Sequence, residues 1–280
     1  MNLNVKLPTP LEYFAQLVES DDEFPLLEAA ASLAADVYPA MDTEQVRDQI
    51  DALAVRLRGR VATGADALQR LRALNQLFFE ELRFGLNRND FYNPDNSFVH
   101  QVLVTRQGVP ISLGVLWLEL AQGLGLKARG IGFPGHFLVS VQVPQGLIVI
   151  DPATGESLGR EQLSEHLDGL APTDEAGHTI HLDVDACLKP STPREILARM
   201  LRNLREIYAS QGDKVHLLGV LHRLVLLLPG VTDLRRERGL LHAELGELPA
   251  ALADLEWCLQ HGEHNAQLAE RVAQLRAAGS

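Results

Sequence analysis

Residues 108–151, GVPISLGVLWLELAQGLGLKARGIGFPGHFLVSVQVPQGLIVID, organise the rest of the chain. The first half predicts a helix that begins at Val109-Pro110 and ends at Gly123 and Gly125, because proline suits a first helical turn and glycine suits a helix end. Apolar side chains recur along it at helical spacing: Leu113, Leu116, Trp117, Leu120 and Leu124. One face of this helix is therefore expected to lie in the core.

Strands are predicted directly after this helix. Residues 127–133 have the composition of a short strand, and residues 136–143, HFLVSVQV, alternate between apolar and polar side chains. Residues 147–150 are nearly all apolar, which predicts a central strand. The turn Pro144-Gln145-Gly146 is too short for a crossover, so the two strands that it joins must be antiparallel.

The region before residue 86 is predicted to be helical. Helices are expected near residue 11, after Pro25, over residues 43–58 with Asp42 as their cap, and over residues 65–83. Residues 85–106 change character, because they are rich in asparagine and aspartate. We expect a long connection built of turns there, and long connections of this kind often cover a functional pocket.

Helices return near the end of the chain, after a short helix at residues 160–167 and an edge strand at residues 179–184. From Pro193 onward, two glycines followed by acidic residues, Gly212 and Gly246, stand 34 residues apart. This is the period of a tetratricopeptide repeat. Helices are expected at residues 214–227, 249–260 and 266–277, with Leu221 matching Leu255. The sequence thus predicts three regions, at residues 1–85, 86–190 and 191–280.

Composition excludes several classes of function. A net charge of -12 argues against binding to nucleic acid or to an anionic membrane surface. The two cysteines, Cys187 and Cys258, stand in no paired motif, which favours a reducing compartment. The N-terminus lacks the pattern of a signal peptide, and residues 111–126 are too short to span a bilayer. We expect a cytoplasmic protein without a cofactor.

Three polar residues of residues 108–151 are candidates for a shared site: Ser112, His136 and Asp151. Each has an ordinary structural interpretation, as a helix cap, a surface histidine and a turn former. Together they place a hydroxyl at a helix N-terminus, which can hold an oxyanion, and an imidazole and a carboxylate on neighbouring strands. Nucleophile, histidine and aspartate in this order are typical of papain-like and transglutaminase-like sites.

Four short strings carry a closer resemblance: NDFYNPDNS from Asn89, GVPISLG from Gly108, GFPGHFL from Gly132, and IDP from Ile150. With them the chain resembles the SirB-type bacterial family of the transglutaminase-like superfamily, with a tetratricopeptide-like C-terminal tail. The resemblance implies an α+β fold, in which a core with an antiparallel sheet is flanked by N-terminal helices and the helical tail. It also implies that Ser112, His136 and Asp151 stand at the superfamily's cysteine, histidine and aspartate.

Serine at the first position departs from the superfamily pattern. A thiolate can form beside a histidine at neutral pH, whereas a serine hydroxyl needs concerted proton removal and an accurate oxyanion hole. The sequence therefore favours a pseudoenzyme that binds a protein or peptide, with a groove lined also by Tyr92, Asn93, Asn96 and Trp117.

Two alternatives stay open. The first is a protease-like acyl hydrolase or amidase, in which Ser112 attacks, His136 takes the proton and Asp151 orients His136. The second gives these residues only structural roles, as a cap and a hydrogen-bond network. No metal site is expected, because His178 and His181 have no third ligand nearby in the sequence.

Overall fold

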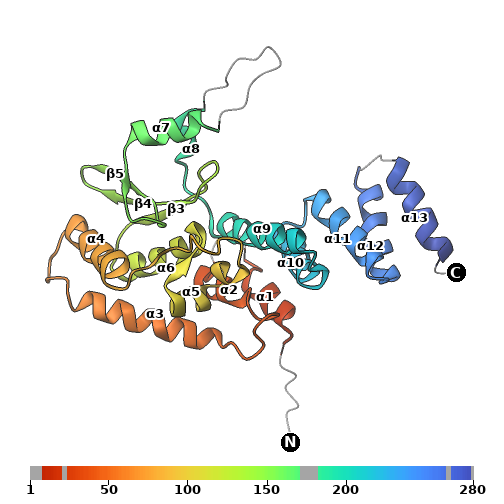
Figure 1. Ribbon diagram of the computed structural model, residues 1–280, viewed down its shortest axis with the longest axis horizontal. Helices are drawn as coiled ribbons and strands as arrows, with labels where there is room; N and C mark the ends of the chain where they lie inside the picture. Colours follow the sequence, from red (N-terminus) through yellow and green to blue (C-terminus); the bar gives the residue numbers. More distant parts are fainter. Residues whose placement is uncertain (1–7, 21–23, 171–181, 263–265, 279–280) are drawn as a thin grey trace, which may run out of the picture. The chain divides into compact units, whose positions relative to one another are not determined.

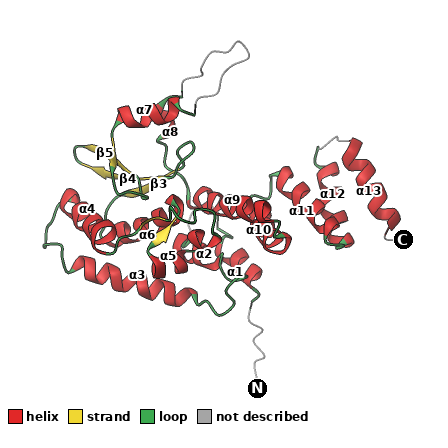
Figure 2. Ribbon diagram, viewed as in Figure 1, coloured by secondary structure: helices red, strands yellow, loops and turns green. Residues whose placement is uncertain are grey.

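The computed structural model describes residues 8–20, 24–170, 182–262 and 266–278 (Figures 1 and 2). They form two compact units. The first, here called the core unit, contains residues 20–200, and the second, the tail unit, contains residues 1–19 and 201–280. The three-region division expected from the sequence stays a prediction. No helix among the described residues combines the length and the apolar character that crossing a membrane requires.

The first helices of the core unit begin and end close to the residues predicted from the sequence. They are α2 (Leu26–Ser32), α3 (Thr43–Arg58), α4 (Ala67–Asn75) and the π-helical segment η1 (Gln76–Glu81). Asp42 caps α3, since its Oδ1 accepts the Glu44 N–H at 2.9 Å. Asp66 and Gln69 form a reciprocal capping box at α4, at 2.8 and 2.9 Å. These caps satisfy amides that a helix start leaves without partners.

The connection expected at residues 85–106 contains regular structure instead. Strands β1 (Gly85–Leu86) and β2 (Gln107–Gly108) pair in parallel, and between them lie the 3-10 helix η2 (Pro94–Ser97) and helix α5 (Val99–Thr105). Helix α5 forms because Val99, Val102 and Leu103 are all buried on its inner face. The helix is only seven residues long, so its apolar spacing is too short to predict a helix in a segment rich in turn-forming residues.

The central helix and sheet confirm the sequence prediction. Helix α6 spans Pro110–Gly123, and the sheet has the order β3 (Ala128–Ile131), β4 (Leu138–Val143), β5 (Gly146–Ile150) and β6 (Ser157–Leu158), antiparallel throughout. The hairpin pairs Val143 with Gly146 and Val139 with Ile150. Strand β5 therefore pairs on both sides, as its apolar sequence predicts.

Helices cover both faces of this sheet (Figure 1). Helix α6 packs closely on one face, where a Cβ added at Gly114 would lie 2.5 Å from the Phe137 ring. The other face buries Ile131, Leu138 and Val149 against α7 (Arg160–Asp168) and α8 (Val184–Cys187). The first half of the edge strand expected at residues 179–184 lies outside the described residues. In the second half, residues 182 and 183 form no strand and Val184 begins α8.

The tail unit is helical, as expected for tetratricopeptide repeats. It contains α1 (Pro10–Leu17), α10 (Lys214–Leu227), α11 (Thr232–Glu244), α12 (Leu248–Gln260) and α13 (Ala266–Ala278), and α9 (Pro193–Gln211) leads into it. Gly212 and Gly246 have φ angles of 69° and 79°, a conformation that glycine adopts without strain. Leu221 and Leu255, which are expected at matching positions of the two repeats, are both fully buried.

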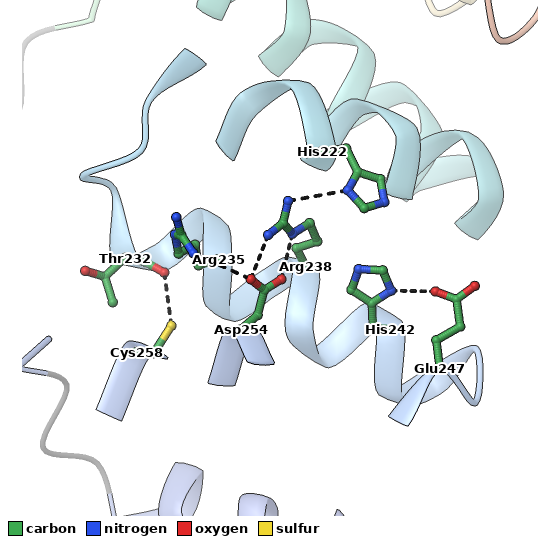
Figure 3. Close-up of polar contacts among 8 residues, drawn as sticks. All are labelled: His222, Thr232, Arg235, Arg238, His242, Glu247, Asp254 and Cys258. Carbon is green, nitrogen blue, oxygen red and sulfur yellow. Dashed lines mark hydrogen bonds and ion pairs between the residues drawn. The ribbon is translucent and has the colours of Figure 1, made fainter. Parts of the chain in front are cut away.

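A group of polar side chains, here called the tail cluster, joins α10, α11 and α12 (Figure 3). Arg238 donates two hydrogen bonds to Asp254, each of 2.6 Å, and its other terminal nitrogen lies 3.4 Å from Nδ1 of His222. His242 contacts Glu247 at 2.5 Å. Burial, with the nearby Arg238 charge, lowers the pKa of His222 to about 4. The cluster therefore holds a neutral imidazole beside a paired guanidinium.

Candidate functional site

His136 and Asp151 form the polar pair of the candidate site in the core unit. Nε2 of His136 lies 3.0 Å from Oδ2 of Asp151, and the two side chains are 22% and 15% exposed. The register of the β4–β5 hairpin explains this meeting, because Val139 pairs with Ile150 and both polar residues lie just beyond that end. The carboxylate therefore faces an imidazole that solvent still reaches.

Backbone hydrogen bonds hold Asp151 in place. Its Oδ1 accepts the N–H of Ala153 at 2.8 Å, and its carbonyl accepts the N–H of Gly155 at 2.7 Å. A Cβ added at Gly155 would lie 2.7 Å from the Phe79 ring, so this turn is packed against η1. The carboxylate thus has one oxygen engaged by the chain and the other free to orient His136.

The His136 ring is fixed on one side and open on the other. A tight turn precedes it, closed by the His136 N–H, which donates to the Phe133 carbonyl at 3.0 Å. With Nε2 held by Asp151, Nδ1 has no hydrogen-bond partner within the part of the chain that the structure describes. The imidazole can therefore present Nδ1, as donor or acceptor, to a ligand.

His166 of α7 joins this site, although no pattern in the sequence predicts it there. Its ring centre lies 6.0 Å from that of His136, and its Nε2 lies 3.2 Å from the Pro134 carbonyl. The two residues are thirty positions apart, and no motif connects them. Only the packing of α7 over the sheet brings this second imidazole to the pair.

Ser112 makes its hydrogen bonds with backbone groups and not with the His136–Asp151 pair. It is fully buried at the start of α6, and its hydroxyl donates to the Asn96 carbonyl at 2.6 Å. The same oxygen lies 3.0 Å from the Val109 carbonyl and accepts the Val109 N–H at 3.1 Å. All of these partners are backbone groups, and His136 is not among them. Ser112 thus closes the first turn of α6 and ties it to η2.

Helix geometry explains why Ser112 does not reach the pair. Gly114 faces the sheet, because a Cβ there would meet Phe137 and Val139. Residues advance by about 100° around a helix axis, so Ser112 stands on nearly the opposite side of α6. Pro110, four positions before Gly114, is the first-turn residue on the sheet side. Of the three side chains expected to share a site, His136 and Asp151 are in contact, and Ser112 points away from them.

The asparagine-rich segment that leads into η2, and η2 itself, are held in place by their own side chains. Asn96 is buried, and its amide donates to the carbonyls of Asp90 at 2.6 Å and Phe91 at 3.2 Å. Asn93 caps η2 by accepting the Asp95 N–H at 2.9 Å. Tyr92, in contrast, is 70% exposed and contacts the Phe91 ring edge-to-face. Of the three predicted binding residues here, Tyr92 is exposed, Asn93 is partly exposed and Asn96 is buried.

Trp117, also expected to line the groove, is fully buried in the core unit. Its indole N–H donates to Oδ1 of Asn75 at 3.0 Å. A side chain without exposed area cannot contact a ligand in this conformation, so Trp117 contributes packing and joins α6 to α4. His178 and His181, for which no metal site is expected, lie outside the described residues.

Comparisons with known proteins agree with this architecture. A family model described as the transglutaminase-like superfamily matches residues 44–202, and a tetratricopeptide repeat model matches residues 204–277. A UPF0162 protein of Xylella fastidiosa (strain Temecula1) is 36% identical over 89% of both chains, and UPF0162 protein PA3419 of Pseudomonas aeruginosa is 32% identical over 84% of this chain and 83% of its own. Human F-box only protein 21 is 44% identical over a shorter stretch, 25% of this chain and 11% of its own length.

Proposed function

The chain belongs to the transglutaminase-like superfamily, and on that premise we propose that it is a non-catalytic protein that binds a peptide or protein segment at the His136–Asp151 pair. We also propose that it belongs to the SirB-type branch, with Ser112 at the position of the superfamily's cysteine. The tetratricopeptide repeats support this proposal, because repeats of this kind provide surfaces for protein interaction. The proposed partner is a polypeptide, recognised without a cofactor or a metal.

The hydrogen bonding and the burial of the Ser112 hydroxyl are the main support for a non-catalytic function. A serine nucleophile needs a base within hydrogen-bond reach that removes its proton as it attacks. The Ser112 hydroxyl instead donates to the backbone carbonyl of Asn96, with 2.6 Å between the two oxygens. The Ser112 side chain has no exposed area. Attack would require breaking the bonds that close the first turn of α6. The residue on the sheet side of that turn, Pro110, carries no nucleophilic atom.

The remaining polar groups suit binding. His136 offers an open Nδ1, and Asp151 fixes the orientation of the ring. Tyr92 and Phe91 are 70% and 43% exposed, on a segment that internal hydrogen bonds hold in one shape. Such preformed aromatic surfaces bind with a small loss of conformational entropy. We therefore assign Tyr92 as an aromatic contact and His136 as a hydrogen-bonding contact.

A serine-dependent acyl hydrolase is the second candidate function. The 3.0 Å contact between His136 and Asp151 favours it, because a carboxylate in this place fixes the tautomer and the orientation of an imidazole. In this alternative, α6 changes its first turn when substrate binds, and Ser112 then reaches His136.

A fluorophosphonate probe that labels activated serines distinguishes the two functions. We expect no labelling of the wild-type chain beyond the level of Ser112→Ala. Ser97→Ala is the matched control, because Ser97 is another fully buried serine of the same region. Labelling that disappears in both Ser112→Ala and His136→Ala, and persists in Ser97→Ala, would establish the hydrolase instead.

A thiol at the same position tests whether the site is only disarmed. We expect Ser112→Cys to show neither amidase nor transamidase activity, because the side chain at this position points away from His136. Iodoacetamide should also modify the buried thiol slowly in the folded chain. Hydrolysis or transamidation that requires both Cys at position 112 and His136 would contradict the proposal.

Binding itself is tested by comparing surfaces. Partners captured by the wild-type chain should be lost with Tyr92→Ala and with His136→Ala. Val55→Ala is the control, because Val55 is 61% exposed on α3, outside the candidate site. If all three variants capture the partner as well as the wild-type chain does, the candidate site does not take part in the interaction.

A further inference from the structure

A cleft of about 410 Å³ opens in the core unit between α3 and α5. Its walls are the segment at residues 37–42, the first turns of α3, and one face of α5 that carries His100, Gln101 and Val104. Val46 of α3 is 2% exposed and lies at its floor. None of these residues belongs to the His136–Asp151 site, so the cleft needs a separate explanation.

The cleft is apolar at its rim as well as at its floor. Val104 is 72% exposed, although α5 packs its other face into the core. Tyr38 forms a wall whose hydroxyl is already used, because it donates to Oδ1 of Asp95 at 2.6 Å. A pocket of this size, with apolar walls and few polar groups, is typical of a binding site for an apolar group.

His100 adds a group with capacity for hydrogen bonding. Both of its ring nitrogens are buried, and neither has a partner among the described residues. Its ring contacts those of Tyr38 and Phe98, at 4.8 and 6.1 Å between centres. Burial lowers the pKa of His100, so the ring is neutral at pH 7, with one donor and one acceptor. Buried polar groups without partners are uncommon in folded proteins.

The surroundings of the cleft are acidic. Asp42 lines the cleft, and residues 42–48, DTEQVRD, contain three carboxylates and one arginine. That arginine, Arg47, lies 3.8 Å from Glu44, and both side chains are more than half exposed. The excess of negative charge beside an apolar cleft favours an occupant with cationic flanks, and disfavours phosphate or carboxylate ligands.

We propose that the α3–α5 cleft binds a polypeptide segment in which one bulky apolar side chain is flanked by lysine or arginine. The apolar side chain enters between Tyr38, Val46 and Val104, and the cationic flanks face the carboxylates of residues 42–48. A peptide amide next to the anchor hydrogen-bonds to His100 after a small rotation of the ring. This site is distinct from the His136–Asp151 pair, so each can fail without the other.

Three fluorescent pentapeptides test the proposal against the full chain: KKFKK, KKGKK and EEFEE, each acetylated and amidated. We expect KKFKK to bind at least about tenfold more tightly than either of the others, because only it supplies both the anchor and the charge. Raising the salt concentration from about 50 to about 300 mM should weaken its binding several-fold, since exposed charges are screened.

Variants locate the binding. Val104→Ser should weaken KKFKK about threefold or more, whereas Val55→Ser, at another exposed valine, should leave it unchanged. Ala40→Trp places an indole at the exposed wall of the cleft and should abolish binding. Thermal melts confirm that each variant is folded, which the exposure of the three positions favours.

Several results would overturn the proposal. Equal affinity for KKFKK and KKGKK would mean that the chain attracts cations without using the cleft. Equal effects of Val104→Ser and Val55→Ser, or full binding by Ala40→Trp, would place the peptide elsewhere. Absence of binding by KKFKK at millimolar concentration would also reject it, because both of its recognition elements are present in that peptide.

Discussion

The core unit and the tail unit each place a histidine beside a charged partner, and the two arrangements differ in what surrounds them. His136 meets Asp151 at the edge of a sheet, where both side chains are partly exposed. In the tail cluster, the side chains of Arg238 and Asp254 are 16% and 6% exposed, and Asp254 accepts two hydrogen bonds from Arg238. One pair can still exchange partners with a ligand, whereas the other is closed by the helices that contain it.

This difference separates function from stability. Removing one partner from a buried charge pair leaves the other charge without compensation, which is costly. Removing a partner from a partly exposed pair lets water take part of its place, and the loss of free energy is smaller. We therefore expect the tail cluster to dominate the stability of its unit, and the His136–Asp151 pair to matter for binding.

The largest expected effect is in the tail cluster. Asp254→Ala should lower the free energy of unfolding of the tail unit by about 3 kcal/mol, because Arg238 loses its partner in a buried place. The two tryptophans allow each unit to be followed separately, since Trp117 is in the core unit and Trp257 in the tail unit. Urea titration of Trp117→Phe chains, with Trp257 as the only tryptophan, measures the change.

Asp151→Ala is the matched control for this experiment, measured in Trp257→Phe chains. It should cost less, because part of the Asp151 side chain is exposed. An Asp254→Ala effect below that of Asp151→Ala would reverse the comparison between the two clusters.

The second effect concerns two buried serines of the core unit. Ser112→Ala should lower stability by about 1 kcal/mol, because its hydroxyl closes the first turn of α6. Ser97→Ala should be neutral or stabilising, because the Ser97 hydroxyl is buried without a hydrogen-bond partner among the described residues. Urea titration followed by Trp117 fluorescence measures both.

Equal losses in the two variants would mean that the bonds of Ser112 add nothing. A much larger loss in Ser97→Ala would indicate that Ser97 has a partner, such as a water molecule, that stabilises it.

The third effect is a dependence on pH in the tail unit. The pKa of His222 is lowered to about 4, mainly by burial and then by the charge of Arg238. Between about pH 6.5 and pH 4 the unfolded chain binds a proton that the folded chain does not, so stability falls as the pH falls through this range. Urea titrations between pH 7.5 and pH 4, with Trp257 as the probe, measure the slope.

His222→Leu should reduce this slope, whereas His261→Gln, at an exposed histidine of the same unit, should change it little. The other charged groups that influence His222 are His242, Asp254 and Arg223, and they remain in both variants. An unchanged slope in His222→Leu would assign the dependence to another group.

The smallest effect on stability is expected at the candidate site. His136→Ala should change the free energy of unfolding of the core unit by less than about 1 kcal/mol, because the pair is partly exposed and water can replace the imidazole. The same variant should lose the captured partner. A loss of several kcal/mol would make the pair a structural element like the tail cluster.

Local sequence patterns predicted much of the fold. Asp42 and the apolar spacing after it determine α3, and the turn Pro144-Gln145 determines the β4–β5 hairpin. The 34-residue spacing of Gly212 and Gly246 predicted the repeats. Each of these signals depends on neighbours in the chain, so no knowledge of distant contacts was needed. Helix α5 escaped prediction because its stability depends on burying three apolar side chains against other elements.

At the candidate site, local sequence patterns predict the strand ends but not which side chains meet. The sequence placed His136 and Asp151 at adjacent strand ends, and hairpin register brings them to 3.0 Å. It could not reveal which side of α6 meets the sheet, because that depends on how Gly114 and Phe137 pack. That contact turns Ser112 away, and packing likewise buries Trp117 and brings His166 to the pair. Periodicity along the chain thus sets the helices and strands, whereas long-range packing sets which side chains share a site.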